Sequence, residues 1–518
     1  MAAAAAPRVG RGGEEVRRMI DRLGAAVGAQ DDHQIASNLK EVPLLVATTP
    51  LTEEQRMDLI ILSWTVLENN DFEVDPLHLG ALAADSLEQL LDGMPAEDVL
   101  ALPQLKAALS LAVAPAHKVA LQQLLRAPAD IAMAQAELVD RVLATVVSDD
   151  VGVGALVVLV LRHWARGPAG VAPVLAPSVL GTLAENADGR PVVLMRVAEA
   201  YMAIAAQSPD AFAAVAGSAA LDPLFVQLEA RDPLERLAAV ELVRGHVGAA
   251  AGVELLERRG VLTGLGVALT DLDGLDGQVL APGILGLFAD LAGLSGVDSA
   301  GLLERHGVLR AIDDAVCTAG AASEQLITAA LDAAATIAAA PNGLAVVVAG
   351  TSDGFLPALR GAVRGEAGQR LAVAAAHAVA RLLDQDGAPS ADLEAARKVF
   401  DCLADGSAAA VLGATIEKAR RPFADEKNSA YHVLQSVAGH GWGASALARV
   451  DGFLEWILDR RGTTKEEREW RYAIVQRVAA HGDLSDDGVR DDIEGWLRQG
   501  PHYRRGVTGD MEVATMTA

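Results

Sequence analysis

The chain has few cysteines and few aromatic residues. Only Cys317 and Cys402 occur in 518 residues, so a disulfide framework is excluded by number. Both are expected to be small buried residues in a reducing compartment. Aromatic residues make up 3% of a chain that is 51% hydrophobic. The core must therefore consist mainly of Ala, Leu and Val. Because Ala and Leu are strong helix formers and β-branched alternation is scarce, we expect almost no sheet.

Basic residues are outnumbered by acidic ones, and the formal net charge is −26. Binding to nucleic acid or to an anionic membrane needs a positive surface, so neither partner is expected. The charge favours solubility and a protein partner with a basic face. A merely solvated acidic surface explains the same charge equally well.

Targeting and membrane signals are also scarce. Residues 1–13 contain an Ala run without an apolar segment after a basic start, so a secretory signal is not expected. The longest uncharged run, residues 333–352, is interrupted by Pro341-Asn342-Gly343. This turn signal predicts two helices and a turn rather than a membrane span.

Motifs of known catalytic and cofactor sites are missing as well. The sequence contains no phosphate loop and no nucleophile elbow, and no histidine is followed by glutamate. Gly152-Val153-Gly154 begins like a dinucleotide loop but lacks the third glycine, so we interpret it as a turn before a buried helix. None of the six Trp residues is followed four positions later by Asn, which excludes the importin-like peptide groove. We expect no enzyme activity, no cofactor and no metal.

A short pattern does recur at a fixed spacing. It consists of two apolar residues, two variable residues and one apolar residue. Its second position falls at Val139, Leu180, Leu221 and Leu262, always 41 residues apart. The pattern returns at Leu309 and Leu356 after intervals of 47, and at Leu454 after 98, which is about two more units. A period of about 40 to 47 residues is typical of armadillo or HEAT arrays. We therefore predict an all-α fold, a right-handed α-solenoid of armadillo/HEAT-like helical repeats.

One predicted repeat runs from Ser208 to Val247 and shows the expected helix punctuation. Ser208-Pro209 and Asp232-Pro233 each place a capping side chain before a proline, and a helix begins between them at Leu221. Three helices per repeat is the armadillo arrangement, in which the third helix lines the binding surface. The next repeat contains Asp271–Gly277, which is too rich in Gly and Asp for a helix and is predicted to be an exposed loop.

The predicted solenoid spans residues 14–506 as one domain. Residues 1–13 are expected to form a disordered N-terminus and residues 507–518 a flexible tail. Aromatic residues gather at the end of the array, where seven of the ten Trp and Tyr residues lie from position 431 onward. They suit either a core that caps the last repeat or a contact with a partner.

The C-terminal third carries a resemblance to a known family. Its motifs are Gly439-His440-Gly441-Trp442, the run 451–460 (DGFLEWILDR), Trp470–Val475 and Gly500-Pro501-His502-Tyr503. Upstream, Leu280–Gly283 with Phe288–Ala292 matches a Pro-Gly helix entry found mid-chain in that family. Together these segments resemble the family of 26S proteasome non-ATPase regulatory subunit 5, over about residues 30–505.

The resemblance implies a chaperone for assembly of the base of the proteasome regulatory particle. Members of this family bind the C-terminal domain of a proteasomal AAA ATPase subunit and are absent from the finished proteasome. By this resemblance we expect a cytoplasmic protein that is monomeric when free, with the nucleus as an additional compartment left open. The alternative is another armadillo adaptor, such as a nucleotide-exchange factor for a heat-shock ATPase.

Contacts with a partner are expected at polar positions on the third helices, which line the binding surface in armadillo proteins. At each position an ordinary solvated helix face is the competing explanation. The candidate residues are Arg196, Glu199, Glu235, Arg236, Glu241, Arg244, His377 and Arg381.

Overall fold

The computed structural model describes residues 11–69, 75, 77–92, 94–110, 113–166, 168–272, 274–317, 323–366, 368–385, 387–461, 463–481 and 487–503. The chain divides into two compact units, Met1–Ala230 and Arg231–Ala518, which are described separately. Most of the predicted N-terminal disordered segment and all of the predicted tail lie outside the described residues. Residues 11–13, predicted to be disordered, instead form the first turn of helix α1.

The described residues contain helices and no β-strand, as the composition predicts. The helices of the first unit are α1(Arg11–Ala29), α2(Asp32–Thr48), α3(Glu53–Asn69), α4(Leu79–Leu91), α5(Ala96–Ala101), α6(Pro103–Ala108), α7(Ala114–Arg126), α8(Ala129–Met133), α9(Ala136–Ala144), η2(Thr145–Val147), α10(Val151–Trp164), α11(Pro168–Val174), α12(Pro177–Ala187), α13(Pro191–Ala205), α14(Pro209–Ala216) and α15(Asp222–Leu228).

The second unit is built from helices of similar length. They are α16(Pro233–His246), α17(Ala250–Arg258), α18(Val261–Ala268), α19(Leu275–Ala292), α20(Ser299–Arg305), α21(Val308–Cys317), α22(Glu324–Ala338), α23(Gly343–Gly350), α24(Phe355–Arg364), α25(Gln369–Leu383), α26(Ser390–Ala404), α27(Ala408–Arg420), α28(Ala424–Ala438), α29(Gly441–Ala448), α30(Phe453–Leu458), α31(Lys465–His481) and α32(Asp487–Gln499).

The recurring apolar pattern marks the second helix of successive three-helix repeats. It falls on α9, α12, α15, α18, α21, α24 and α30, and α27 supplies the second helix within the 98-residue interval. At least two of its three apolar positions are buried in each repeat because they form one stripe of a short helix: Leu262 is 0% and Leu265 1% exposed. This confirms the predicted all-α solenoid of armadillo/HEAT-like repeats.

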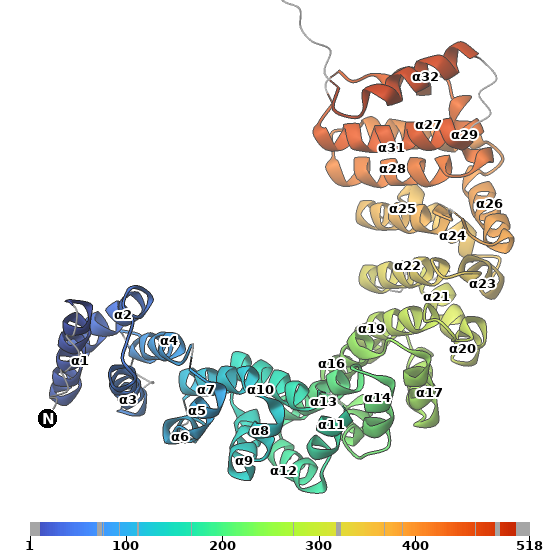
Figure 1. Cartoon of the computed structure of the whole chain (residues 1–518). Helices are drawn as coiled ribbons and strands as arrows, with labels where there is room; N and C mark the ends of the chain where they lie inside the picture. Colours follow the sequence, from blue (N-terminus) through green and yellow to red (C-terminus); the bar gives the residue numbers. More distant parts are fainter. Residues whose placement is uncertain are drawn as a thin grey trace, which may run out of the picture. The chain divides into compact units, whose positions relative to one another are not determined.

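Third helices of neighbouring repeats pack side by side within each unit. In the first unit α7 packs on α10 and α10 on α13. In the second unit the row runs α16, α19, α22, α25, α28 and α31, each packed on the next. Figure 1 shows the later helices of this row stacked in parallel layers, with α20, α23, α26 and α29 to the right of them. Each third helix therefore buries one stripe and leaves a ridge exposed on a shared surface.

The predicted helix starts around Ser208 and Asp232 are confirmed. The Ser208 side chain accepts a hydrogen bond from the backbone N–H of Ala211 at the start of α14. Asp232 accepts from the N–H groups of Leu234 and Glu235 at the start of α16. These side chains satisfy backbone donors that the first helical turn leaves unpaired.

The loop predicted over Asp271–Gly277 is wrong at its end, because α19 already begins at Leu275. Gly277 makes this early start possible. A Cβ added there would lie 1.8 Å from the Asp271 carbonyl oxygen, so only glycine lets the chain fold back so tightly. Pro282, expected at a helix entry, lies inside α19.

The two cysteines were expected to be buried, but Cys317 is exposed and Cys402 is half-buried. Cys317 is the last residue of α21, where the helix end reaches solvent. Partial burial and the neighbouring Asp313 carboxylate raise the pKa of the Cys317 thiol to about 11. It therefore remains protonated and unreactive at neutral pH.

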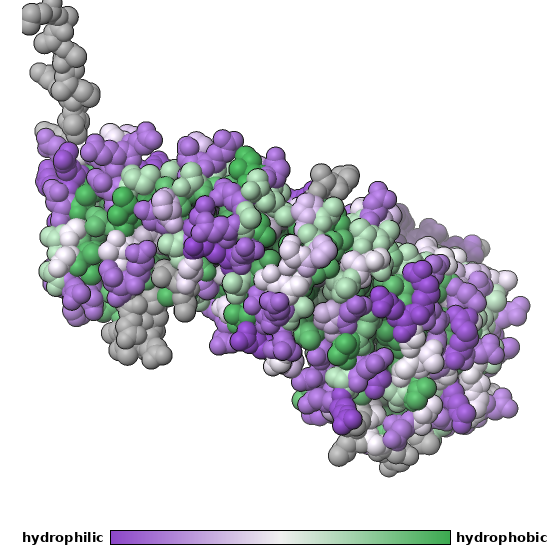
Figure 2. All heavy atoms as spheres, turned by 90° about the horizontal axis from the view of Figure 1, so that it is seen from below, coloured by the Kyte–Doolittle hydropathy of each residue, from purple (hydrophilic) through white to green (hydrophobic). Residues whose placement is uncertain are grey.

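The surface mixes polar and apolar side chains. The face shown in Figure 2 has apolar patches separated by polar residues. Within the described part of the chain, no single helix is long and apolar enough to cross a membrane. The pair Ser390–Ala404 and Ala408–Arg420, bent by 80°, reaches that length and composition only when taken together.

Candidate partner-binding face

The exposed ridges of α16, α19, α22, α25, α28 and α31 form one continuous surface of the second unit, here called the third-helix face. Successive helices of this row are in contact, so side chains on adjacent ridges come within reach of one another. Ridges about 10 Å apart suit a surface that touches a folded partner at many points.

Ion pairs between neighbouring repeats cross this face. The Arg244 Nε on α16 lies 2.5 Å from the Asp290 Oδ2 on α19. The Arg381 Nη1 on α25 lies 3.1 Å from the Asp332 Oδ1 on α22, and Arg381 also donates to the Thr336 hydroxyl. The Asp290 carboxylate raises the pKa of Arg244. All four charged side chains remain more than a third exposed, so each pair adds little stability but holds the charges in fixed places.

Two histidines meet on the same face. The Nδ1 atoms of His377 on α25 and His432 on α28 are 3.2 Å apart. The His432 ring also lies 6.0 Å from the Trp470 ring of α31. Burial lowers the pKa of both histidines because it disfavours the charged imidazolium, and a charged His377 would repel a charged His432. Both rings therefore favour the neutral form.

Two glycines of α19 bring the ridge of α16 close to its backbone. A Cβ added at Gly286 would lie 2.7 Å from the Arg244 Nη1. At Gly283 it would lie 2.6 Å from the Leu237 Cδ1. The side chains of α16 thus lie directly on α19, which keeps this part of the third-helix face shallow.

The sequence-predicted contact residues fall into two groups. Glu235, Arg236, Glu241 and Arg244 lie on α16, and His377 and Arg381 lie on α25, which are both third helices of the second unit. Arg196 and Glu199 lie on α13 of the first unit. Arg244 and Arg381 are engaged in the inter-repeat ion pairs, and Arg236 donates to the Gly264 carbonyl at 3.3 Å. Glu199 is exposed, and the Glu241 Oε2 lies 3.9 Å from the Arg244 Nη1 on the same helix.

Arg196 has an internal contact that the sequence did not reveal. Its guanidinium donates to the carbonyl oxygens of Val146 and Ser148, at the end of the short helix η2. A Cβ added at Gly154 would lie 2.4 Å from the Arg196 Nε, so this glycine makes room for the side chain. Gly152 and Gly154 lie within α10 rather than in the predicted turn. Arg196 therefore ties neighbouring repeats together.

For each interacting pair of side chains on the third-helix face, sequence reasoning identified only one of the two residues. The missed residues are Asp290, Asp332 and His432. Each lies about one repeat from its partner, at separations of 46, 49 and 55 residues. Opposite charges spaced by one repeat on successive third helices were the signal that could have found the ion pairs.

The C-terminal aromatics mainly build the core that ends the array. Tyr431 is fully buried, and its ring stacks against Trp456 and Trp470 at 5.9 and 6.3 Å. Arg471 lies over the Trp456 ring and donates to the Tyr431 hydroxyl. Of the two explanations left open by the sequence, these contacts favour the capping core.

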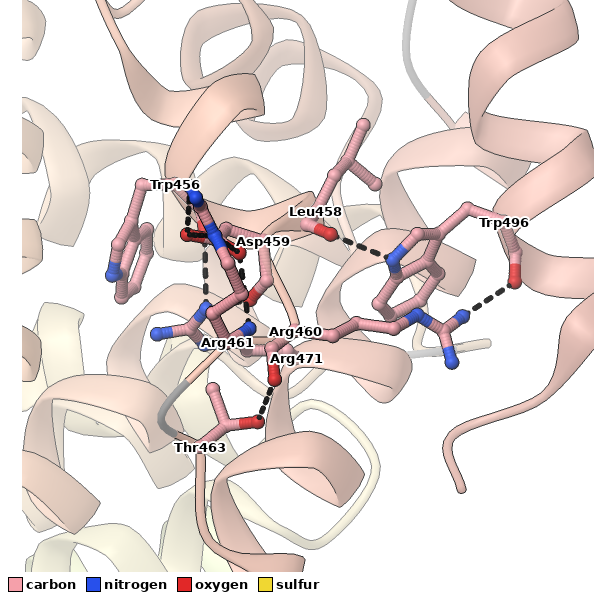
Figure 3. A network of polar contacts seen from close by, with 8 residues as sticks. All are labelled: Trp456, Leu458, Asp459, Arg460, Arg461, Thr463, Arg471 and Trp496. Carbon is pink, nitrogen blue, oxygen red and sulfur yellow. Dashed lines mark hydrogen bonds and ion pairs between the residues drawn. The ribbon is translucent and has the colours of Figure 1, made fainter. Parts of the chain in front are cut away.

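Arg460 fixes helix α32 to this core. Its guanidinium donates to the Trp496 and Gly500 carbonyl oxygens at 2.9 and 2.7 Å and lies 4.3 Å from the centre of the Trp496 ring. The Trp496 indole N–H donates to the Leu458 carbonyl oxygen. Figure 3 shows Arg460 and Arg471 directed to opposite sides of the segment after α30.

These features define the class of protein. Among the described residues, no group of three or more His, Cys, Asp or Glu side chains is arranged to hold a metal ion. What the repeats do provide is an extended polar face with fixed charges. The molecule is a helical-repeat protein of the armadillo/HEAT-like class.

Comparison with known proteins identifies the family. The sequence matches the family described as "Proteasome non-ATPase 26S subunit" over residues 38–516. The chain belongs to this proteasome subunit family. A 118-residue stretch is 24% identical to the 26S proteasome non-ATPase regulatory subunit 5 of Drosophila melanogaster and covers 22% of each chain.

Helical-repeat proteins of known structure also align with the chain. An engineered protein aligns with a TM-score of 0.42 at 14% identity and covers 80% of this chain and 100% of its own. A designed armadillo repeat protein in complex with the peptide (KR)4 aligns with a TM-score of 0.37 at 17% identity, covering 50% and 99%.

Proposed function

We propose that this protein is a non-catalytic chaperone for assembly of the base of the proteasome regulatory particle. In this proposal its third-helix face binds the C-terminal domain of a proteasomal AAA ATPase subunit and delays docking of that subunit on the core particle. Membership of the proteasome non-ATPase subunit family over residues 38–516 carries the proposal. The protein acts in the cytoplasm, with the nucleus as an additional compartment, and is a monomer when free.

The third-helix face supports this role through its extent and its charges. Six successive helices contribute to it, which offers a partner an area of the order of 800 Å² or more, as stable protein interfaces require. Its ion pairs and hydrogen bonds hold charged groups at set positions. Such a surface suits a folded domain held by many modest contacts.

The mechanism is steric. A domain held on the third-helix face cannot present the covered surface to another assembly partner. Release follows when ring assembly buries the same surface of the ATPase, because the two interactions then compete. No chemical step and no bound cofactor is needed.

The test is co-purification with each base ATPase subunit expressed in turn. We expect recovery of an ATPase subunit without stoichiometric core-particle subunits. Recovery of a heat-shock ATPase alone would instead support the nucleotide-exchange alternative and refute the proposal.

A charge swap tests the face itself. The double variant Arg244→Asp/Asp290→Arg keeps an ion pair but inverts its direction, so the fold is retained while the charges shown to a partner change. We expect at least tenfold weaker binding of the ATPase subunit. The matched control is Arg310→Asp/Asp314→Arg, a 3.6 Å pair within the second helix α21. Equal binding by the two variants would remove the α16–α19 part of the face from the interface.

A further inference from the structure

The first unit contains an apolar groove that the proposed function does not use. Its volume is about 510 Å³, and it opens between the second helices α12 and α15 over α13. Leu183, Val197 and Tyr201 lie at its base and are at most 3% exposed. The Tyr201 hydroxyl donates to the Val174 carbonyl oxygen at 2.8 Å, so the base has no unpaired hydroxyl. This volume and lining are typical of sites that bury an apolar group.

The groove is separate from the ridge that carries the candidate contact residues of α13. Leu194, Val197 and Tyr201 line the groove and form one stripe of the helix. Glu199, two residues after Val197, lies about 200° further around the helix. Anything bound in the groove therefore leaves the Glu199 side of α13 open.

The rim of the groove is apolar and acidic. Val226 on α15 is 65% exposed although it borders the apolar groove. The carboxylates of Asp188 and Asp222 also line the rim. Asp188 has no cationic partner among the described residues. Gly181 on α12 also lines the groove, and a Cβ added there would meet nothing within 4 Å.

We propose that this groove is a second docking site, which takes an aromatic or leucine side chain from a basic segment of a protein partner. The volume and the apolar base select a large apolar side chain. The acidic rim, in a chain of net charge −26, selects basic residues on either side of it. The site does not depend on the third-helix face, so this proposal and the proposed function can fail separately.

A groove-filling variant provides the test. Gly181→Leu places a side chain in the open space of the groove and improves helix propensity, so the fold should be retained. The matched control is Gly264→Leu on α18, the second helix of a later repeat, where an added Cβ also meets nothing within 4 Å. Asp188→Lys tests the contribution of the acidic rim.

The probe is a fluorescein-labelled synthetic peptide of lysine and alanine with one central tryptophan. Its binding to the full chain is measured by fluorescence anisotropy. Two matched peptides replace the tryptophan by alanine or every lysine by glutamate. We expect binding of the Lys/Trp peptide to the wild type and to Gly264→Leu, and at least tenfold weaker binding to Gly181→Leu and Asp188→Lys. Both matched peptides should bind at least tenfold more weakly than the probe.

Several outcomes would overturn the proposal. No binding of the probe, or equal binding by Gly181→Leu and wild type, excludes the groove. If the alanine peptide binds as well as the probe, charge attraction alone explains the binding and the apolar groove is not needed. If the glutamate peptide binds as well as the probe, a basic segment is excluded as the occupant. Concentration-dependent dimerisation that Gly181→Leu abolishes would assign the groove to a second copy of this chain.

A separate measurement tests whether the two surfaces act independently. If they do, Gly181→Leu should co-purify with the ATPase subunit as well as the wild type does.

Discussion

Arg471 allows the stability of the C-terminal cap, the core formed by α28, α30 and α31, to be predicted quantitatively. This side chain is 9% exposed and donates to the carbonyl oxygens of Trp456 and Asp459 at 2.8 and 2.6 Å. It also donates to the Tyr431 hydroxyl at 3.2 Å. The two carbonyl groups lie at the end of α30, where the Trp456 oxygen also accepts from the backbone N–H of Asp459 at 3.3 Å. Arg471→Met removes all three hydrogen bonds and leaves the apolar stem in place.

The expected loss is about 3 kcal/mol. A hydrogen bond from a charged donor contributes about 1.5 to 3 kcal/mol, and the three bonds share one guanidinium, so their contributions do not add fully. Stability in a repeat array is largely local, so the loss should appear in α28, α30 and α31 rather than across the chain. About 3 kcal/mol corresponds to opening that is about 100-fold more frequent.

Native-state hydrogen exchange followed by mass spectrometry measures this opening helix by helix. The control is Arg461→Met, because the Arg461 side chain is 92% exposed and pairs only with Asp459 among the residues in Figure 3. We expect the control to change local stability by less than about 0.5 kcal/mol. If Arg471→Met exchanges no faster than Arg461→Met in α30 and α31, the reasoning about the cap is wrong.

Two further predictions concern pH and a buried carboxylate. The folded-state pKa values of His377 and His432 are lowered, so the unfolded chain binds more protons and stability should fall as pH decreases below about 6.5. His377→Gln/His432→Gln should reduce the fall in melting temperature between neutral pH and about pH 5, and an unchanged fall would contradict this assignment. Asp392 is 0% exposed and accepts from the N–H groups of Asn342 and Ala345 at the start of α23. Asp392→Ala should cost about 2 kcal/mol in urea unfolding and Asp392→Asn less, whereas equal losses would show that the acceptor oxygens are not what matters.

Local signals in the sequence were sufficient to place most helices. The apolar pattern at Val139, Leu180 and Leu262 found second helices because a short helix needs a buried stripe at this spacing. Ser208 and Asp232 marked helix starts because their side chains bond to backbone groups only two or three residues away. Information within one helix determines these features, so they can be derived without the fold.

Sequence reasoning fell short where contacts outside a single helix decide the outcome. The helix from Leu275 depends on a close approach between Gly277 and the Asp271 carbonyl, which composition alone cannot show. Arg196 is predicted to contact a partner, and the structure adds hydrogen bonds to carbonyl oxygens 48 and 50 residues away that the sequence did not reveal. Its partners are set by how one repeat stacks on the previous one.

The sequence by itself determined that this is an acidic helical array and, through its C-terminal motifs, which family it resembles. The repeat period, the helix caps and the composition depend on local sequence patterns, so they can be derived from the sequence alone. Only the tertiary structure decided that Arg244 meets Asp290, that His377 meets His432 and that Val226 borders an apolar groove. These contacts join residues a repeat or more apart, and the packing register of the repeats, not the local sequence, brings them together.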